Sequence, residues 1–216
     1  MWGGATTTDA LAEAIAAGSR RLAAVDPVLG SMLERFGPPS LNVDPRLFRT
    51  LVMAIVSQQL SSAGAAAIMR RVEVLFPAAS PLDPSLMAAM PPDDLRGAGL
   101  SRAKVAALHD LAAHVLDGRL ELERMDELSD DEVVAELVAV RGIGPWTAEM
   151  FLMFSLGRLD VLPADDYGVR NAVKRAYELP ALPTKKELIA RGTPWHPYCT
   201  VASLLLWSSL ENQPLR

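Results

Sequence analysis

The stretch VRGIGPWTAEMF, which begins at Val140, places two glycines and a proline within four residues of a chain that otherwise reads as helix. The helix expected to end near Val140 and the helix expected to begin at Pro145 are joined only by Arg141 to Gly144. A connection this short needs backbone conformations that glycine adopts readily, and proline suits the first turn of a helix, where no N–H is required. We therefore predict a tight helical hairpin at about residues 130–156. The N–H groups that start its second helix suit an anion such as phosphate.

Helix signals recur along the rest of the chain. The segments SDDE at 129–132 and TKKE at 184–187 are capping boxes, which mark helix starts. Apolar residues cover most sides of a helix expected at 44–58, and a last helix is expected at 193–211. Strand signals are missing, so we predict an all-α fold.

No segment is expected to cross a membrane. The longest apolar runs, such as VASLLLW at 201–207, are far shorter than the ~20 residues that a membrane span needs. The N-terminal sequence lacks a basic stretch followed by an apolar one, as a secretory leader would have. We expect a cytoplasmic protein.

Composition argues against several kinds of site. Cys199 is the only cysteine, which excludes an internal disulfide and a zinc or iron–sulfur site held by cysteines. The histidines show no ligand spacing with carboxylates, so we expect no metal bound by side chains. The net charge of −5 argues only weakly against a nucleic-acid partner, because local basic patches decide phosphate attraction.

Two adjacent acids, Asp165 and Asp166, follow an apolar helix and a loop that contains Gly157 and Pro163. Taken alone, the pair is equally well explained as the N-terminal cap of the next helix. Their place after the hairpin is what suggests a catalytic role.

The hairpin, the apolar helix, the loop with glycine and proline, and the acid together resemble the helix-hairpin-helix Gly/Pro-Asp (HhH-GPD) superfamily of DNA glycosylases. The resemblance implies two helical lobes with the active site in the cleft between them. It implies a central domain at 46–160 and a second lobe formed by 1–45 plus 161–216.

The resemblance also implies roles for single residues. The segment DYGVR matches the family pattern Asp-x-x-hydrophobic-basic, which makes Asp166 the catalytic carboxylate and Asp165 a cap or a support. Main-chain amides of the hairpin would grip a DNA phosphate at Gly142, Gly144 and Thr147. Hairpin carbonyls often hold Na⁺ or K⁺ in this family, here those of Val138, Val140 and Ile143, and no other cofactor is expected.

Trp146 stands where family members that also cut the DNA backbone carry a lysine for Schiff-base chemistry. We therefore expect a glycosylase without lyase activity. With a tryptophan at this position, the chain resembles the 3-methyladenine DNA glycosylase II branch, whose base pockets are aromatic. This resemblance implies a base pocket walled by Trp146, Tyr167 and Trp207.

Two further segments resemble the same branch. MAIVSQQLSSAGA at 53–65 is similar to its IxxQQxS motif and implies that Gln59 fills the gap left by a flipped nucleotide. GAGLSRAKVAALHDLA at 97–112 is similar to its GLSxxKxxxL motif and places Lys104 near a DNA phosphate.

These resemblances imply a monomeric, monofunctional enzyme that acts on damaged double-stranded DNA. It would flip out alkylated purines (3-methyladenine, 7-methylguanine, etheno-adenine or hypoxanthine) and hydrolyse their N-glycosidic bond, leaving an abasic site. Two alternatives stay open at this point. One is a DNA-binding or damage-sensing protein that uses the hairpin without catalysis, and the other is a glycosylase for a different lesion.

Overall fold

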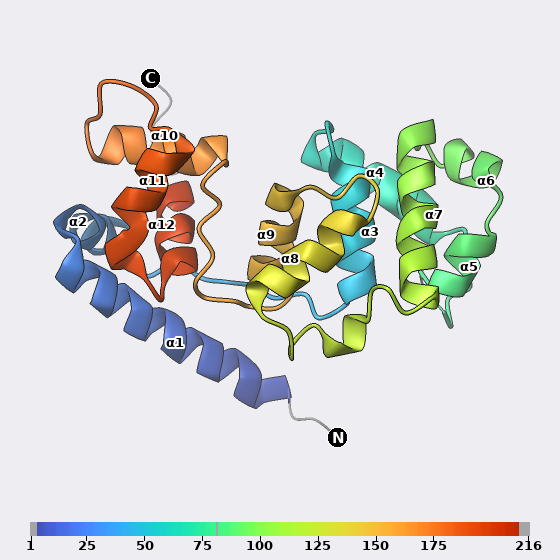
Figure 1. Ribbon diagram of the computed structural model, residues 1–216, viewed down its shortest axis with the longest axis horizontal. Helices are drawn as coiled ribbons and strands as arrows, with labels where there is room; N and C mark the ends of the chain where they lie inside the picture. Colours follow the sequence, from blue (N-terminus) through green and yellow to red (C-terminus); the bar gives the residue numbers. More distant parts are fainter. Residues whose placement is uncertain (1–3, 81, 212–216) are drawn as a thin grey trace. The chain divides into compact units, whose positions relative to one another are not determined.

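The computed structural model describes residues 4–80 and 82–211, which form helices joined by short turns (Figure 1). No strand occurs within these two ranges, so the predicted all-α fold is confirmed. The chain divides into two compact units, a first unit of Met1–Val43 with Leu152–Arg216 and a second unit of Asp44–Phe151.

The second unit contains α3 to α8 and most of α9. Its elements are α3 (Leu47–Ser57), α4 (Ser62–Glu73), α5 (Pro84–Ala89), α6 (Pro92–Gly97), α7 (Arg102–Leu116), η1 (Leu122–Arg124), α8 (Asp130–Ala139) and α9 (Pro145–Phe154). Helix α3 is apolar on most sides and packs against α4 and α7, with Leu51, Val52 and Val56 fully buried. Burial of this helix supplies the centre of the unit.

The first unit joins both ends of the chain. Its elements are α1 (Gly4–Val25), α2 (Pro27–Phe36), α10 (Tyr167–Ala176), α11 (Lys185–Gly192), η2 (Thr193–Trp195) and α12 (Cys199–Glu211). Helix α12 contacts α1, α2 and α10 and buries apolar residues such as Val201, Leu205 and Leu206. An apolar central helix surrounded by three others is the core of this unit.

Asp26 links the two parts of the first unit through hydrogen bonds. Its Oδ1 accepts the N–H groups of Val28 and Leu29 and so caps α2. Its Oδ2 accepts the Trp195 indole N–H at 2.9 Å and the Tyr177 hydroxyl at 2.5 Å. Trp195 is fully buried, which agrees with a structural role for this side chain.

The expected central domain at 46–160 differs from the second unit at both ends. Phe154 stacks on Trp207, and the N–H of Thr200 donates to the carbonyl of Leu159. Residues 152–160 therefore pack with α12 in the first unit.

Local sequence patterns predicted several helix starts correctly. Both capping boxes are present, with Ser129 and Glu132 at the start of α8 and Thr184 and Glu187 at the start of α11. The break between α8 and α9 also lies where the glycines and Pro145 predict it.

Two predicted starts were wrong. Helix α3 begins at Leu47, because Asp44 binds the Arg46 guanidinium and N–H instead of capping the helix. The last helix begins at Cys199 and not at Thr193, because His196 precedes a proline and takes an extended ψ of 140°.

Within the described ranges, no helix combines the length and the apolar character that a bilayer span requires.

Candidate functional site

Asp166 is the N-cap residue of α10, and its carboxylate is held by two donors. Its Oδ1 accepts the N–H of Val169 at 2.8 Å and the indole N–H of Trp207 at 3.0 Å. Its own N–H donates to the carbonyl of Pro163 at 2.9 Å. The same residue therefore caps a helix and presents a carboxylate fixed from two helices. Its catalytic role stays a prediction.

Trp207 comes from α12 and has a defined orientation. Its ring stacks on Phe154 with centroids 6.3 Å apart and an interplanar angle of 28°. A Cβ added at Gly168 would lie 3.0 Å from both Asp166 Oδ1 and Trp207 Nε1. Glycine at position 168 therefore leaves space for the hydrogen bond between Trp207 and Asp166. No signal in the sequence revealed this requirement.

The residues on either side of Asp166, Asp165 and Tyr167, are both exposed. Asp165 is exposed, and its carboxylate pairs with the Lys185 ammonium at 2.5 Å. This acid supports the loop and does not cap the helix. Tyr167 is 68% exposed at the first position of α10.

The hairpin turn in the second unit has the geometry that its glycines predict. Gly142 has a φ of +82°, in the left-handed region where a side chain is strained. The N–H of Ile143 donates to the Val140 carbonyl, and the N–H of Ala148 donates to the Gly144 carbonyl, which opens α9. A Cβ at Gly144 would meet nothing within 4 Å, so the backbone there has open space around it.

Side chains from two other helices hold this turn. Asp110 on α7 accepts the N–H of Arg141 at 2.7 Å. The Gln58 side-chain amide, just after α3, donates to the Gly142 carbonyl at 2.7 Å. The hairpin is therefore anchored on both sides, at positions whose role no local sequence signal reveals.

Gln59 is exposed and takes a φ of +58°, which is unusual for a residue other than glycine. The turn that carries it is fixed by Lys104, whose ammonium donates to the carbonyls of Val56 at 2.8 Å and Gln58 at 2.7 Å. Burial lowers the pKa of this lysine. The ammonium that the sequence placed at a DNA phosphate thus binds the end of α3.

A family comparison bears on these residues. The profile of the "HhH-GPD superfamily base excision DNA repair protein" family matches residues 52–197, which include the hairpin and Asp166. The chain belongs to the HhH-GPD superfamily.

Individual HhH-GPD relatives are similar over most of this chain. The crystal structure of DNA-3-methyladenine glycosidase from Bacillus halodurans has a TM-score of 0.83 and 39% identity, covering 90% of this chain and 89% of that one. The Schizosaccharomyces pombe 3-methyladenine DNA glycosylase Mag1, solved in complex with abasic DNA, has a TM-score of 0.80 and 30% identity, covering 90% and 96%. YfjP of Bacillus subtilis is 31% identical over 85% of this chain, and the match spans 66% of that longer protein.

The remaining residues predicted for the site lie in the second unit. Trp146 is 48% exposed and Thr147 is buried, both in the first turn of α9. The carbonyls expected to hold a monovalent cation belong to the end of α8 and the turn: Val138, Val140 and Ile143. Carbonyls at a helix C-terminus carry partial negative charge, which suits a cation. The cation site stays a prediction.

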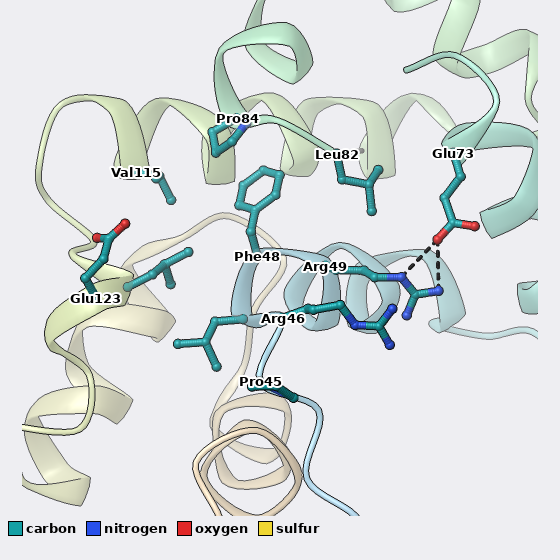
Figure 2. A pocket seen from close by; sticks show the side chains of 11 residues that line it. Pro45, Arg46, Phe48, Arg49, Glu73, Leu82, Pro84, Val115 and Glu123 are labelled. Carbon is teal, nitrogen blue, oxygen red and sulfur yellow. Dashed lines mark hydrogen bonds and ion pairs between the residues drawn. The ribbon is translucent and has the colours of Figure 1, made fainter. Parts of the chain in front are cut away.

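A pocket of about 630 Å³ lies in the second unit, beside the start of α3 (Figure 2). Apolar side chains such as Phe48 and Leu82 line it, and its arginines are paired: Arg49 binds Glu73 at 2.8 Å and Arg46 binds Asp44 at 2.7 Å. None of the residues predicted for the site lines this pocket, and we assign it no role in the reaction.

Within the described part of the chain, one group of side chains has the donor types for a metal ion: Asp160, His196 and Cys199 in the first unit. Spacing along the sequence does not reveal this group, because Asp160 and His196 lie 36 residues apart. Burial and the nearby Asp160 carboxylate raise the pKa of the Cys199 thiol.

Proposed function

We propose that this HhH-GPD protein is a monofunctional DNA glycosylase that removes alkylated purines from double-stranded DNA and leaves an abasic site. The observation that carries the proposal is the hydrogen bond from Trp207 to Asp166, which joins an aromatic ring to the acid of the family motif. Two of the relatives, a 3-methyladenine DNA glycosylase and a DNA-3-methyladenine glycosidase, support the same reaction.

The chemistry needs a fixed carboxylate. Breaking the N-glycosidic bond builds positive charge on the deoxyribose as the base departs, and a carboxylate in a preorganised site stabilises that charge. A carboxylate at this position can also orient or deprotonate the attacking water. Because the reacting carbon is inaccessible within a duplex, the nucleotide must first leave the base stack.

Aromatic side chains account for the choice of base. Alkylation at N3 or N7 gives a purine a positive charge, and a cation is attracted to the face of a tryptophan or tyrosine. In this proposal Trp207, Tyr167 and Trp146 wall the base pocket. Substrates would be 3-methyladenine and 7-methylguanine, and also etheno-adenine or hypoxanthine. With Trp146 in place of the Schiff-base lysine, strand cleavage is not expected.

The hairpin would hold DNA through its backbone. The amides of Gly142, Gly144 and Thr147 would contact a phosphate, helped by Na⁺ or K⁺ at the hairpin carbonyls, and Gln59 would fill the gap in the duplex. Such backbone contacts carry no sequence information, so the enzyme would scan DNA. It would work as a monomer, and in the cytoplasm on chromosomal DNA.

The test measures free base released from methylated duplex DNA, identified by chromatography, for the wild type, Asp166→Asn and Asp165→Asn. Asparagine caps helices as well as aspartate does, so Asp166→Asn keeps the cap of α10 while it removes the charge. We expect Asp166→Asn to lose base release and keep DNA binding, and Asp165→Asn to stay active.

Other outcomes select the alternatives. Binding without release of any base from methylated, deaminated or etheno-containing duplexes would identify a non-catalytic damage-sensing protein. Release of only a deaminated or oxidised base would identify a glycosylase for a different lesion.

A further inference from the structure

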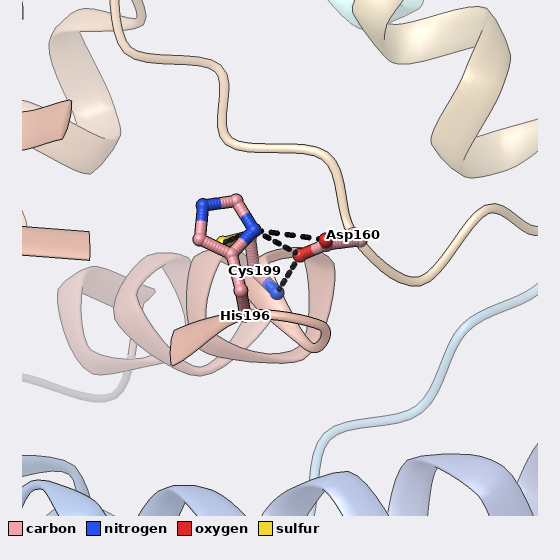
Figure 3. A group of neighbouring side chains, drawn as sticks. All are labelled: Asp160, His196 and Cys199. Carbon is pink, nitrogen blue, oxygen red and sulfur yellow. Dashed lines mark hydrogen bonds and ion pairs between the residues drawn. The ribbon is translucent and has the colours of Figure 1, made fainter. Parts of the chain in front are cut away.

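Three side chains of different donor types meet where α12 begins (Figure 3). Asp160 lies in the loop after α9, His196 precedes α12, and Cys199 is the first residue of that helix. His196 Nδ1 lies 2.8 Å from Asp160 Oδ2 and 3.6 Å from Cys199 Sγ. The three ligand atoms all lie within 4.8 Å of one another.

Two of these separations, nitrogen–sulfur and oxygen–nitrogen, are close to those around a small tetrahedral ion, and the Asp160 oxygen and the Cys199 sulfur lie within 4.8 Å. Zinc bonds of about 2.0–2.3 Å set neighbouring ligand atoms roughly 3.3–3.6 Å apart. The nitrogen–sulfur separation of 3.6 Å already has this value. The oxygen–nitrogen pair, now a hydrogen bond of 2.8 Å, must open by roughly half an ångström. The His196 and Asp160 side chains are 54% and 37% exposed, so they have room to move while the buried Cys199 stays fixed.

The backbone around the cluster is held in place by other bonds. Thr200 donates its hydroxyl to the Arg158 carbonyl and accepts the N–H of Val161. Asp160 Oδ1 accepts the N–H of Cys199 at 3.2 Å. The loop and the helix start that carry the ligands are thus joined without an ion, which reduces the ordering that an ion would have to impose.

We propose that Asp160, His196 and Cys199 bind one Zn²⁺ ion, with water as the fourth ligand. Mixed sulfur, nitrogen and oxygen donors in a tetrahedral arrangement favour zinc among the common divalent ions. On binding, the Cys199 thiol gives its proton to solvent and the thiolate binds the ion. The ion would fasten the loop that leads to Asp166 to the helix that carries Trp207.

Titration of the metal-free protein with Co²⁺ tests the site, with Zn²⁺ as the competing ion. Cobalt bound to a thiolate gives a charge-transfer absorption band, and Cys199 is the only source of a thiolate in this chain. We expect the band to saturate at one ion per chain and to disappear when Zn²⁺ is added. We also expect Zn²⁺ to raise the melting temperature, because it binds the folded state.

Variants decide between a site and adventitious thiol binding. His196→Gln and Asp160→Asn should weaken metal binding by at least about 100-fold, because even partners outside the coordination sphere contribute roughly 10–100-fold. His109→Gln is the matched control and should bind as the wild type does. His196 is exposed and Asp160 is partly exposed, so the substitutions at these two residues test the site even if Cys199→Ser fails to fold. Absence of the band in the wild type, or its persistence in both variants, would overturn the proposal.

Discussion

Trp207 donates its indole N–H to Asp166 Oδ1 at 3.0 Å, while its ring stacks on Phe154. The carboxylate is thereby fixed from α12 as well as from its own helix, which also donates the N–H of Val169. Hydrogen bonds to an ionised group contribute more than neutral ones do. We therefore expect the tryptophan to act as a positioning residue for Asp166, in addition to its proposed place in the pocket wall.

Replacing Trp207 with phenylalanine separates these two roles. Trp207→Phe keeps an aromatic ring against Phe154 and removes the donor. We expect single-turnover base release to slow by about 10-fold or more, since a hydrogen bond to a charged group is worth roughly 1.5–3 kcal/mol. The melting temperature should fall by several degrees, since each kcal/mol of lost stability shifts it by roughly 2–4 °C in a chain of this size, whereas DNA affinity should change little. An unchanged rate would show that the indole N–H has no part in positioning Asp166.

Gly168→Ala places a methyl group against both partners of this hydrogen bond, 3.0 Å from each. Alanine within a helix is otherwise more stable than glycine by roughly 0.5–1 kcal/mol. We therefore expect base release to fall while the free energy of unfolding stays equal or rises. Gly97→Ala, at a helical glycine with nothing within 4 Å of its added Cβ, is the control: base release should be unaffected, and the free energy of unfolding should stay equal or rise. Equal effects of the two substitutions on base release would contradict this explanation.

The two hairpin glycines should respond differently to alanine. Gly142→Ala forces a side chain into a φ of +82°, and we expect it to destabilise the fold by roughly 1–2 kcal/mol, measured by denaturant unfolding. Gly144→Ala adds a methyl group in open space, so the free energy of unfolding of this variant should match that of the wild type. If a phosphate approaches the backbone there, this variant should nonetheless bind duplex DNA more weakly. Unaltered binding by Gly144→Ala would argue against phosphate contact at this position.

Lys104→Met tests whether this lysine holds the turn or a DNA phosphate. Its ammonium donates to the carbonyls of Val56 and Gln58, so we expect the variant to lose order at Gln59 and to flip nucleotides less well. The dependence of DNA affinity on salt should stay as in the wild type. Loss of a phosphate contact would instead reduce the slope of log K against log salt by about one. Arg102→Met removes an exposed positive charge from the same helix and serves as the control for the loss of charge alone.

Signals confined to a few residues predicted the structure well. The capping boxes at Ser129 and Thr184 need only a side chain and an amide three residues on, so their sequence pattern suffices. The hairpin was predicted for the same reason. The start of the last helix was missed because Pro197 pushes His196 into an extended conformation, a local effect that the apolar pattern of the helix concealed.

Contacts between distant segments could not be predicted. Nothing in the sequence pairs Gln58 with the Gly142 carbonyl, 84 residues away, or directs Lys104 towards the end of α3. The family resemblance pointed to the acid and the hairpin. The space that Gly168 leaves for Trp207 is visible only in the packing of the folded chain.

Asp166 uses one oxygen, Oδ1, both to cap α10 and to accept the Trp207 indole. Most replacements of this residue would therefore alter folding and chemistry together, and a lost activity would not reveal which of the two had failed. Asparagine is the exception, because it retains the capping geometry without the charge. At this position, replacing one carboxylate oxygen with an amide group separates the effect on folding from the effect on the reaction.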